Sequence, residues 1–167
     1  YKFNEAAAAV YQFVWHELCD WYLELIKPVL YGSEDNAAVV AARRTLRRTL
    51  QTSLKLLHPF MPFLTEEIWQ TLVADGTSIM VSEFPREDEL LADPEAEARM
   101  GLVMDVISAI RNIRGEVNIA PSKKANVRIF APEDEGAAVI AAERGHIVNL
   151  ANLQSLEIDR SPEEPKG

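Results

Sequence analysis

The sequence predicts a mainly α-helical protein in which an antiparallel helical bundle is followed by a small β-α-β appendage. Two observations predict this fold class. Long stretches without glycine or proline carry apolar side chains at helical spacing, and near residue 123 the apolar spacing changes to every second residue. We place the bundle at residues 1–120, the appendage at 121–160 and a linker at 161–167. A hydrophobic share of 48% is ample for a buried core in 167 residues.

The first predicted helix covers residues 3–27, which contain neither glycine nor proline, and it ends before Pro28 after roughly 36 Å. Its stripe consists of Phe3, Ala7, Val10, Val14, Leu18, Trp21 and Leu25, widened by Tyr11, Trp15, Tyr22 and Ile26. So wide a stripe indicates more than one neighbour inside a bundle. Stacking of an aromatic ring on an unpaired RNA base is the alternative interpretation.

The second predicted helix covers residues 37–57, after a break at 32–36. Its predicted buried side consists of Val39, Leu46, Leu50, Ser53 and Leu57. The opposite side carries Arg44, Arg48, Gln51 and Lys55, with Arg43 and Arg47 at its border. The four arginines, here called the arginine band, have no acidic residue among them, and their i, i+4 pairs are like-charged. The band is either an ordinary solvated face or a surface for phosphates.

A net charge of −9 argues at first against a nucleic-acid partner, because phosphate binding depends on lysine and arginine. The charges are unevenly distributed, however. Residues 1–57 contain seven basic and six acidic side chains, and residues 101–131 contain five basic and two acidic side chains. A local basic surface on an acidic protein therefore remains compatible with the sequence.

The segment LLHPFMPFLTEEIW, residues 56–69, predicts a corner between two helices. Pro59 ends the second helix, and Pro62 suits the first turn of a third. Helical spacing places Phe63, Ile68, Trp69 and Leu72 on the core side, and Thr65, Glu66 and Gln70 away from it. Residues 75–92 then predict a connection with a weak strand signal at 79–84.

Asp93 and Pro94 form a typical helix start, and the helix is predicted to continue to Glu116. Its predicted buried stripe is Ala96, Val103, Ile107, Ile110 and Val117. Arg114 lies on the same stripe, and a buried cation requires a partner. We expect a structural ion pair between Arg114 and a carboxylate of the first helix, for which the candidates are Glu17, Asp20 and Glu24.

Residues 123–131 and 153–158 predict two strands, separated by a helix at 134–150. This order favours a parallel pair with a right-handed crossover. Because an isolated pair would be a poor domain, the strands are expected to lean on the bundle or to lack a further strand.

No pattern for catalysis is present. The sequence contains no glycine-rich phosphate loop, no nucleophile elbow and no ligand spacing for a metal, and His16 with Cys19 is only an isolated pair. No segment predicts a membrane span or a signal peptide, so we expect a cytoplasmic location. Physical reasoning alone therefore predicts a helical bundle with a small α/β appendage and a candidate basic binding band, and it does not reach a function.

Three segments carry a resemblance to a known family. Residues 2–28, KFNEAAAAVYQFVWHELCDWYLELIKP, closely resemble a hallmark segment of valyl-tRNA synthetases of the bacterial type. Residues 57–69 resemble the corner shared by valyl, isoleucyl and leucyl enzymes, and RNIRGEVNIAPSKK, residues 111–124, resembles the following helix end. The resemblance implies a piece of a longer enzyme, namely the anticodon-binding bundle of a class I aminoacyl-tRNA synthetase and the small α/β piece after it.

The resemblance also implies what this piece does. The parent enzymes attach valine to its tRNA using ATP, but the His-Ile-Gly-His and Lys-Met-Ser-Lys-Ser signatures are absent here. We therefore expect no valine activation and no cofactor in this chain, with ATP and Mg bound by a catalytic domain elsewhere in the parent. The implied partners are the tRNA for valine and that catalytic domain. The residues predicted to face RNA are Arg43, Arg44, Arg47 and Arg48, with Lys55, Arg111, Lys123 and Lys124 as weaker candidates.

Two alternatives stay open. In the first, the chain is a helical protein-interaction bundle whose arginines bind acidic partners. In the second, it is the equivalent domain of an isoleucyl or leucyl enzyme. Because the implied bundle begins upstream of residue 1, an exposed apolar flank and self-association through it are also expected.

Overall fold

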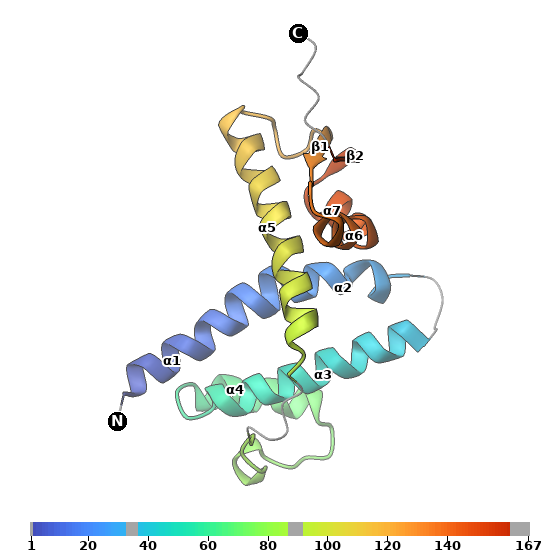
Figure 1. Cartoon of the computed structure of the whole chain (residues 1–167). Coiled ribbons are helices and arrows are strands. Elements are labelled where there is room, and N and C mark those ends of the chain that lie inside the picture. Colours follow the sequence, from blue (N-terminus) through green and yellow to red (C-terminus); the bar gives the residue numbers. More distant parts are fainter. Residues whose placement is uncertain (1, 33–36, 87–91, 161–167) are drawn as a thin grey trace. The chain divides into compact units, whose positions relative to one another are not determined.

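The computed structural model describes residues 2–32, 37–86 and 92–160, and it is mainly helical with a small two-stranded parallel sheet (Figure 1). The chain divides into two compact units, Tyr1–Leu91 and Ala92–Gly167. The helix 94–116 is grouped with the second unit because it contacts the helices of the appendage, as described below, and the predicted domain boundary at residue 120 stays a prediction. The predicted linker at 161–167 lies outside the described residues.

The first unit begins with continuous helical backbone from α1 (Phe3–Gln12) through η1 (Phe13–Tyr22) to α2 (Leu23–Leu30). The predicted helix is present, but η1 is a π-helix, whose hydrogen bonds span five residues instead of four. The helix also continues past Pro28. Proline is tolerated here because only one turn follows it, which Tyr31 closes by donating its N–H to the Lys27 carbonyl.

Of the predicted apolar stripe of this long helix, seven residues are half-buried, and Phe3, Tyr11 and Trp15 are exposed, contrary to the predicted burial. Leu18 is its buried member, whereas Tyr11 and Trp15 are each 54% exposed. These two rings stack on each other, with centroids 6.2 Å apart and planes 5° from parallel. The stripe is assigned with α-helical periodicity, which the π-helical segment does not follow. The stripe is also too wide for α3 alone to cover.

Helix α3 (Ala37–Leu57) has the predicted bounds, and it contacts α1, α2 and α4. Val39, Ser53 and Leu54 are buried on it, while Leu46, Leu50 and Leu57 of the predicted set are half-buried. Helix α4 (Pro62–Leu72) begins at the predicted proline. The corner therefore has the predicted form, a helix that stops before Pro59 and a second that starts at Pro62.

The core beside this corner is formed by Leu54, Trp69 and Ile79. Three predictions for α4 were wrong, because Phe63 is 90% exposed, Ile68 is 37% exposed and Thr65 is buried. Thr65 tolerates burial since its hydroxyl donates to the Met61 carbonyl at 2.8 Å. In place of the weakly predicted strand at 79–84, Ile79–Val81 form a short 3-10 helix, η2.

The second unit begins with α5 (Pro94–Glu116), and the Asp93 carboxylate caps it by accepting from the Ala96 N–H at 3.0 Å. Val103, Ile107, Ile110 and Arg114 are buried as predicted. Ala96 and Val117 are exposed, because they lie where α5 begins and just after it ends. The predicted central part of the stripe is therefore confirmed.

The rest of this unit comprises β1 (Ala125–Phe130), α6 (Asp134–Ala142), α7 (Arg144–Leu150) and β2 (Leu153–Asp159). The strands pair in parallel, with Val127 opposite Leu156 and Arg128 opposite Glu157. The predicted single helix is two helices, because the chain leaves helical geometry at Glu143. Helix α5 contacts both α6 and α7, so one core formed around Ile107, Ile147 and Leu156 unites the unit.

Candidate nucleic-acid interface

The arginine band lies on the exposed side of α3. Arg43, Arg44, Arg47 and Arg48 are all exposed, whereas Val39 and Leu54 fix the other side of the helix in the unit. The helical period places these side chains over little more than one turn. Arg43 and Arg48 also make interactions within the chain. Four cations on one rigid helix form a surface suited to the phosphates of a nucleic acid.

Helix α3 is tied to the first helix beside the band. Tyr22, the last residue of η1, makes a side-chain hydrogen bond with Thr45, which lies between Arg44 and Leu46 in the sequence. Burial raises the pKa of Tyr22 above its ordinary value of 10.0, and the hydrogen bond with Thr45 partly opposes that rise. The arginines therefore project from a helix whose position is fixed by a polar contact as well as by packing.

Lys55 continues the same side of α3 into its last turn. Its ammonium nitrogen lies 5.5 Å from the centroid of the Trp69 ring, within reach of a cation–π interaction. The Trp69 ring in turn donates its N–H to the Thr77 carbonyl at 2.9 Å. Lys55 is therefore a half-buried cation with a defined position, in contrast to the exposed arginines.

A pocket that sequence reasoning missed adjoins Lys55. Its volume is about 200 Å³, and its lining residues are Lys55, His58, Pro59, Ile79, Met80, Ser82, Glu83 and Phe84. The only signal for it in the sequence was the cluster of proline and aromatic residues at the corner and at 84–85. That signal was insufficient, because the pocket requires two segments more than 20 residues apart to meet.

The loop that forms the pocket is attached to α4 by hydrogen bonds. Ser78 donates to the Glu66 carboxylate at 2.8 Å, and Gln70 donates to the same carboxylate at 2.6 Å. The hydrogen bond from Gln70, followed by that from Ser78, holds the pKa of Glu66 below its ordinary value of 4.5. Glu66 and Gln70 therefore stabilise the loop, although the sequence analysis gave them no role.

We expect the Glu66 carboxyl to titrate below pH 4.5, and the Ser78→Ala substitution to move its midpoint upward. Because the folded pKa is the lower one, Glu66 stabilises the fold above its unfolded pKa, and this contribution is lost as pH falls through the folded value. Carboxyl carbon NMR during an acid titration measures the midpoint. Ser82→Ala is the matched control, since Ser82 donates to the Ile79 carbonyl and should leave the midpoint unchanged. An equal midpoint in wild type and Ser78→Ala would contradict the assignment.

In the second unit, Arg111 and Arg114 both bind backbone carbonyls. Arg111 is exposed and donates to the Leu150 carbonyl at 3.2 Å from Nε and at 2.9 Å from Nη2. Arg114 is 7% exposed, and it donates to the carbonyls of Asn152, Ala120 and Lys123 at 3.0, 3.3 and 2.6 Å. Each guanidinium therefore has a structural role within this unit.

The burial predicted for Arg114 is thus confirmed, and within its own unit the guanidinium binds carbonyl oxygens. Five N–H donors in a planar fork can satisfy several carbonyls at once, so no acidic residue is required. Among the candidates, Asp20 is paired with His16 and Glu24 with Lys27. The expected ion pair would join the two units, and it stays a prediction.

Lys123 and Lys124 are exposed just before β1. The Lys123 backbone carbonyl accepts from Arg114, so a buried residue fixes the position of this pair of lysines. They belong to the second unit, whereas the arginine band belongs to the first.

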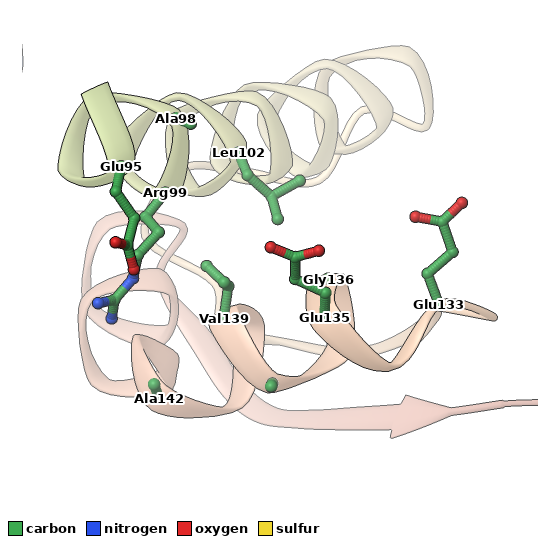
Figure 2. A pocket seen from close by; sticks show the side chains of 10 residues that line it. Glu95, Ala98, Arg99, Leu102, Glu133, Glu135, Gly136, Val139 and Ala142 are labelled. Atoms are coloured by element: carbon green, nitrogen blue, oxygen red, sulfur yellow. The ribbon is translucent and has the colours of Figure 1, made fainter.

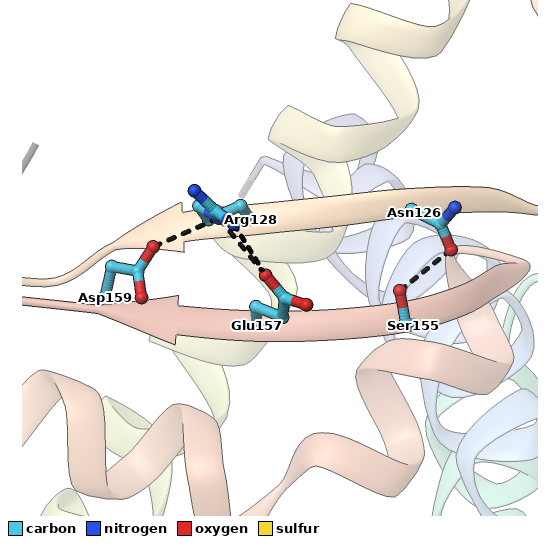
Figure 3. Close-up of polar contacts among 5 residues, drawn as sticks. All are labelled: Asn126, Arg128, Ser155, Glu157 and Asp159. Carbon is cyan, nitrogen blue, oxygen red and sulfur yellow. Dashed lines mark hydrogen bonds and ion pairs between the residues drawn. The ribbon is translucent and has the colours of Figure 1, made fainter. Parts of the chain in front are cut away.

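Two other surfaces of the second unit are unsuited to phosphate. A groove of about 550 Å³ between α5 and α6 carries Glu95, Glu133 and Glu135 on its rim (Figure 2), and Arg99 beside it is paired with Glu143 at 3.4 Å. The outward face of the sheet bears a polar ladder in which Arg128 lies between Glu157 and Asp159 (Figure 3). Carboxylates dominate both surfaces and would repel a polyanion.

The part of the chain that the structure describes contains no cluster of three or more His, Cys, Asp or Glu side chains suited to a metal ion. Within the same residues, no helix is both long and apolar enough to cross a membrane.

Comparison with known proteins gives consistent matches. Residues 1–129 match the family model described as the anticodon-binding domain of tRNA ligase. The chain is 44% identical over 167 residues to the valine–tRNA ligase of Syntrophotalea carbinolica, covering 99% of this chain and 18% of that protein. It is 44% identical over 167 residues to that of Geobacter sulfurreducens and 40% over 165 residues to that of Geobacillus stearothermophilus, covering 99% of this chain and 19% of each relative. The chain thus spans slightly less than a fifth of the length of these relatives.

Proposed function

Because the chain belongs to the family of anticodon-binding domains of tRNA ligases, we propose that it binds the anticodon stem and loop of the tRNA for valine, as part of a valine–tRNA ligase. The relatives cited above are all valine–tRNA ligases, which favours valine over the isoleucyl and leucyl alternatives. The full-length enzyme attaches valine to its tRNA using ATP, and this chain contributes tRNA binding to that reaction.

The observation that supports RNA binding best is the arginine band. RNA stems present phosphates at regular spacing, and cations held on a rigid helix gain affinity by displacing the counterions of those phosphates. Arg44 and Arg48 follow one side of α3, with Arg43 and Arg47 beside them. Lys55, Arg111, Lys123 and Lys124 complete the proposed set, although Arg111 also supports α7 through the Leu150 carbonyl.

The remaining features of the proposal concern the parent enzyme. Its helices form an antiparallel bundle of the class I type, and the β-α-β appendage follows that bundle. ATP and Mg are bound by its catalytic domain, which is a partner of this chain, and the enzyme works in the cytoplasm. The exposed Tyr11–Trp15 stack marks the flank through which this chain contacts the rest of the bundle or associates with itself.

The proposal predicts a preference for the cognate tRNA. A titration of the 167-residue chain with valine tRNA and with a non-cognate tRNA, each at two salt concentrations, measures affinity and its salt dependence together. We expect tighter, salt-dependent binding to valine tRNA. Equal affinity for all polyanions would instead support the interaction-bundle alternative, and the absence of any binding would contradict the proposal for this chain.

A further inference from the structure

We propose that the pocket beside Lys55, here called the Lys55 pocket, binds one unpaired base that carries an exocyclic amino group, that is adenine, cytosine or guanine. This inference rests on the proposed function and adds a base-reading site to the phosphate-binding surface of α3. It follows from the size of the pocket, its walls, its hydrogen-bonding groups and its position relative to the arginine band.

The size of the pocket favours a single ring system. Its volume of about 200 Å³ lies below the ~300–1,000 Å³ typical of sites for drug-sized ligands. A whole nucleotide with its sugar and phosphate would therefore extend beyond the pocket. A base alone can enter, provided that it is not stacked or paired in a helix, as in an RNA loop.

The walls of the pocket provide apolar surfaces suited to a flat ring. Pro59 lies on one segment, and Met80 and Phe84 lie on the other. Phe84 is 59% exposed, so much of its ring is accessible to a ligand. Proteins commonly hold unpaired bases by stacking them on aromatic side chains in this way.

The hydrogen bonds of the corner favour one tautomer of the neutral His58 ring. The Thr65 hydroxyl donates to the Met61 carbonyl at 2.8 Å and lies 2.7 Å from Nδ1 of His58. Since its single proton goes to Met61, the hydroxyl must accept from His58, and Nδ1 carries the proton. In the neutral imidazole Nε2 is then an acceptor, and His58 is one of the residues that line the pocket.

The other polar groups of the pocket are also mostly acceptors. Glu83 contributes a carboxylate, and the Ser82 hydroxyl oxygen retains accepting capacity because its proton is donated to the Ile79 carbonyl at 2.7 Å. Lys55 is the main donor. A base with an exocyclic amino group offers two N–H donors to these acceptors and a ring nitrogen or carbonyl to Lys55. Uracil has one N–H donor on its pairing edge, and its carbonyls would face the Glu83 carboxylate.

The position of the pocket relates it to the arginine band. Arg44, Arg48 and Lys55 follow each other on one side of α3 at i, i+4 and i+11. Along the helix axis, Arg48 and Lys55 are separated by about 10.5 Å, since each residue rises 1.5 Å. If the phosphates of an RNA strand lie on the arginines, a base one or two nucleotides further along that strand is therefore close to the pocket.

The pocket is held in place before any ligand binds. Trp69 and Gln70 both donate to the Thr77 carbonyl, and Ser78 donates to the Glu66 carboxylate. These three hydrogen bonds attach the loop 77–84 to α4. Ile79 is buried in the core beside Trp69. A preformed site loses little conformational entropy on binding, which favours recognition of a single base.

The first test compares two phenylalanine substitutions in the 167-residue chain. Phe84→Ala removes a wall of the Lys55 pocket, whereas Phe63→Ala removes an equally large exposed ring on α4 that does not line it. We expect Phe84→Ala to weaken binding of the valine tRNA anticodon stem-loop about tenfold with the salt slope unchanged. Phe63→Ala should bind as wild type does. Equal affinity of the Phe84→Ala and wild-type chains would overturn the inference.

The second test uses mononucleotides, so that it does not depend on RNA affinity. We expect CMP and AMP to shift the NMR signals of the His58 and Phe84 rings in the wild-type chain, and UMP to require at least about tenfold higher concentration for the same shifts. Absent shifts, or equal shifts with UMP, would overturn the inference even if the chain binds tRNA. Shifts with CMP and AMP in a chain that binds no stem-loop would instead overturn the proposed function and leave the base site standing.

Discussion

The Arg114→Ala substitution is expected to lower the free energy of unfolding of the unit Ala92–Gly167 by about 3 kcal/mol. The guanidinium is buried and donates to three carbonyls, those of Ala120 and Lys123 before β1 and that of Asn152 before β2. Alanine would leave these carbonyls without their charged donor and would open a void at the end of α5. Water can reach part of the site, which limits the loss.

The measurement must follow the second unit specifically. All three tryptophans, Trp15, Trp21 and Trp69, lie in the first unit, so tryptophan fluorescence does not monitor the unit that contains Arg114. Amide hydrogen exchange in the core around Ile107, Ile147 and Leu156 measures the free energy of opening there. We expect faster exchange at these amides and an unchanged fluorescence transition in urea.

Arg128→Ala is the matched control for this prediction. Arg128 is the same residue type in the same unit, but its side chain is 57% exposed and its partners are the surface carboxylates of Glu157 and Asp159. Its loss should cost less than about 1 kcal/mol. Similar costs for the two substitutions would show that Arg114 does not act through its buried carbonyl contacts.

Replacing Arg43, Arg44, Arg47 and Arg48 together by glutamine is expected to weaken tRNA binding about 10² to 10³-fold near 0.1 M salt. For a single strand, each phosphate contact contributes about 0.7 to the magnitude of the slope of log affinity against log salt concentration. The loss of four contacts therefore reduces that magnitude by about 3. Glutamine keeps the helix propensity close to that of arginine, which separates the loss of charge from unfolding of α3.

A second fourfold variant controls for net charge. Lys2, Arg86, Arg144 and Arg160 lie outside the band, and their replacement by glutamine removes the same four charges from the net charge of −9. Filter binding at several salt concentrations compares the two variants. We expect the control to retain most of the affinity and slope. Equal losses would mean that overall charge, and not the band, governs binding.

The helix bounds that were predicted correctly are those with local stereochemical causes. Pro62 starts α4, and Asp93 with Pro94 starts α5, because a missing N–H or a capping carboxylate acts within one turn. The π-helical turns of η1 carry no such local signal, so the stripe of the first helix was assigned with the wrong period. Thr65 shows the same limit, since its burial depends on partners at Met61 and His58 that apolar spacing does not encode.

For the candidate site, too, the features that depend on a local pattern could be predicted, and those that depend on distant segments could not. The exposure of the arginine band follows from helical periodicity once Val39 and Leu54 are buried. The partners of Arg114 lie up to 38 residues away, at carbonyls that any residue type provides, so the sequence could indicate a need for a partner and not its identity. The Lys55 pocket likewise depends on two distant segments meeting, which spacing along one helix cannot reveal.

The charged ladder of the two strands has a consequence for self-recognition. Within the described residues, β1 and β2 pair only with each other, so each has an edge that is available for further backbone pairing. Such edges template aggregation when they are flat and apolar. Here the outward side chains include Arg128, Glu157 and Asp159, which would be buried or brought against like charges if two copies stacked or paired there. The polar ladder therefore disfavours stacking of this sheet on a second copy.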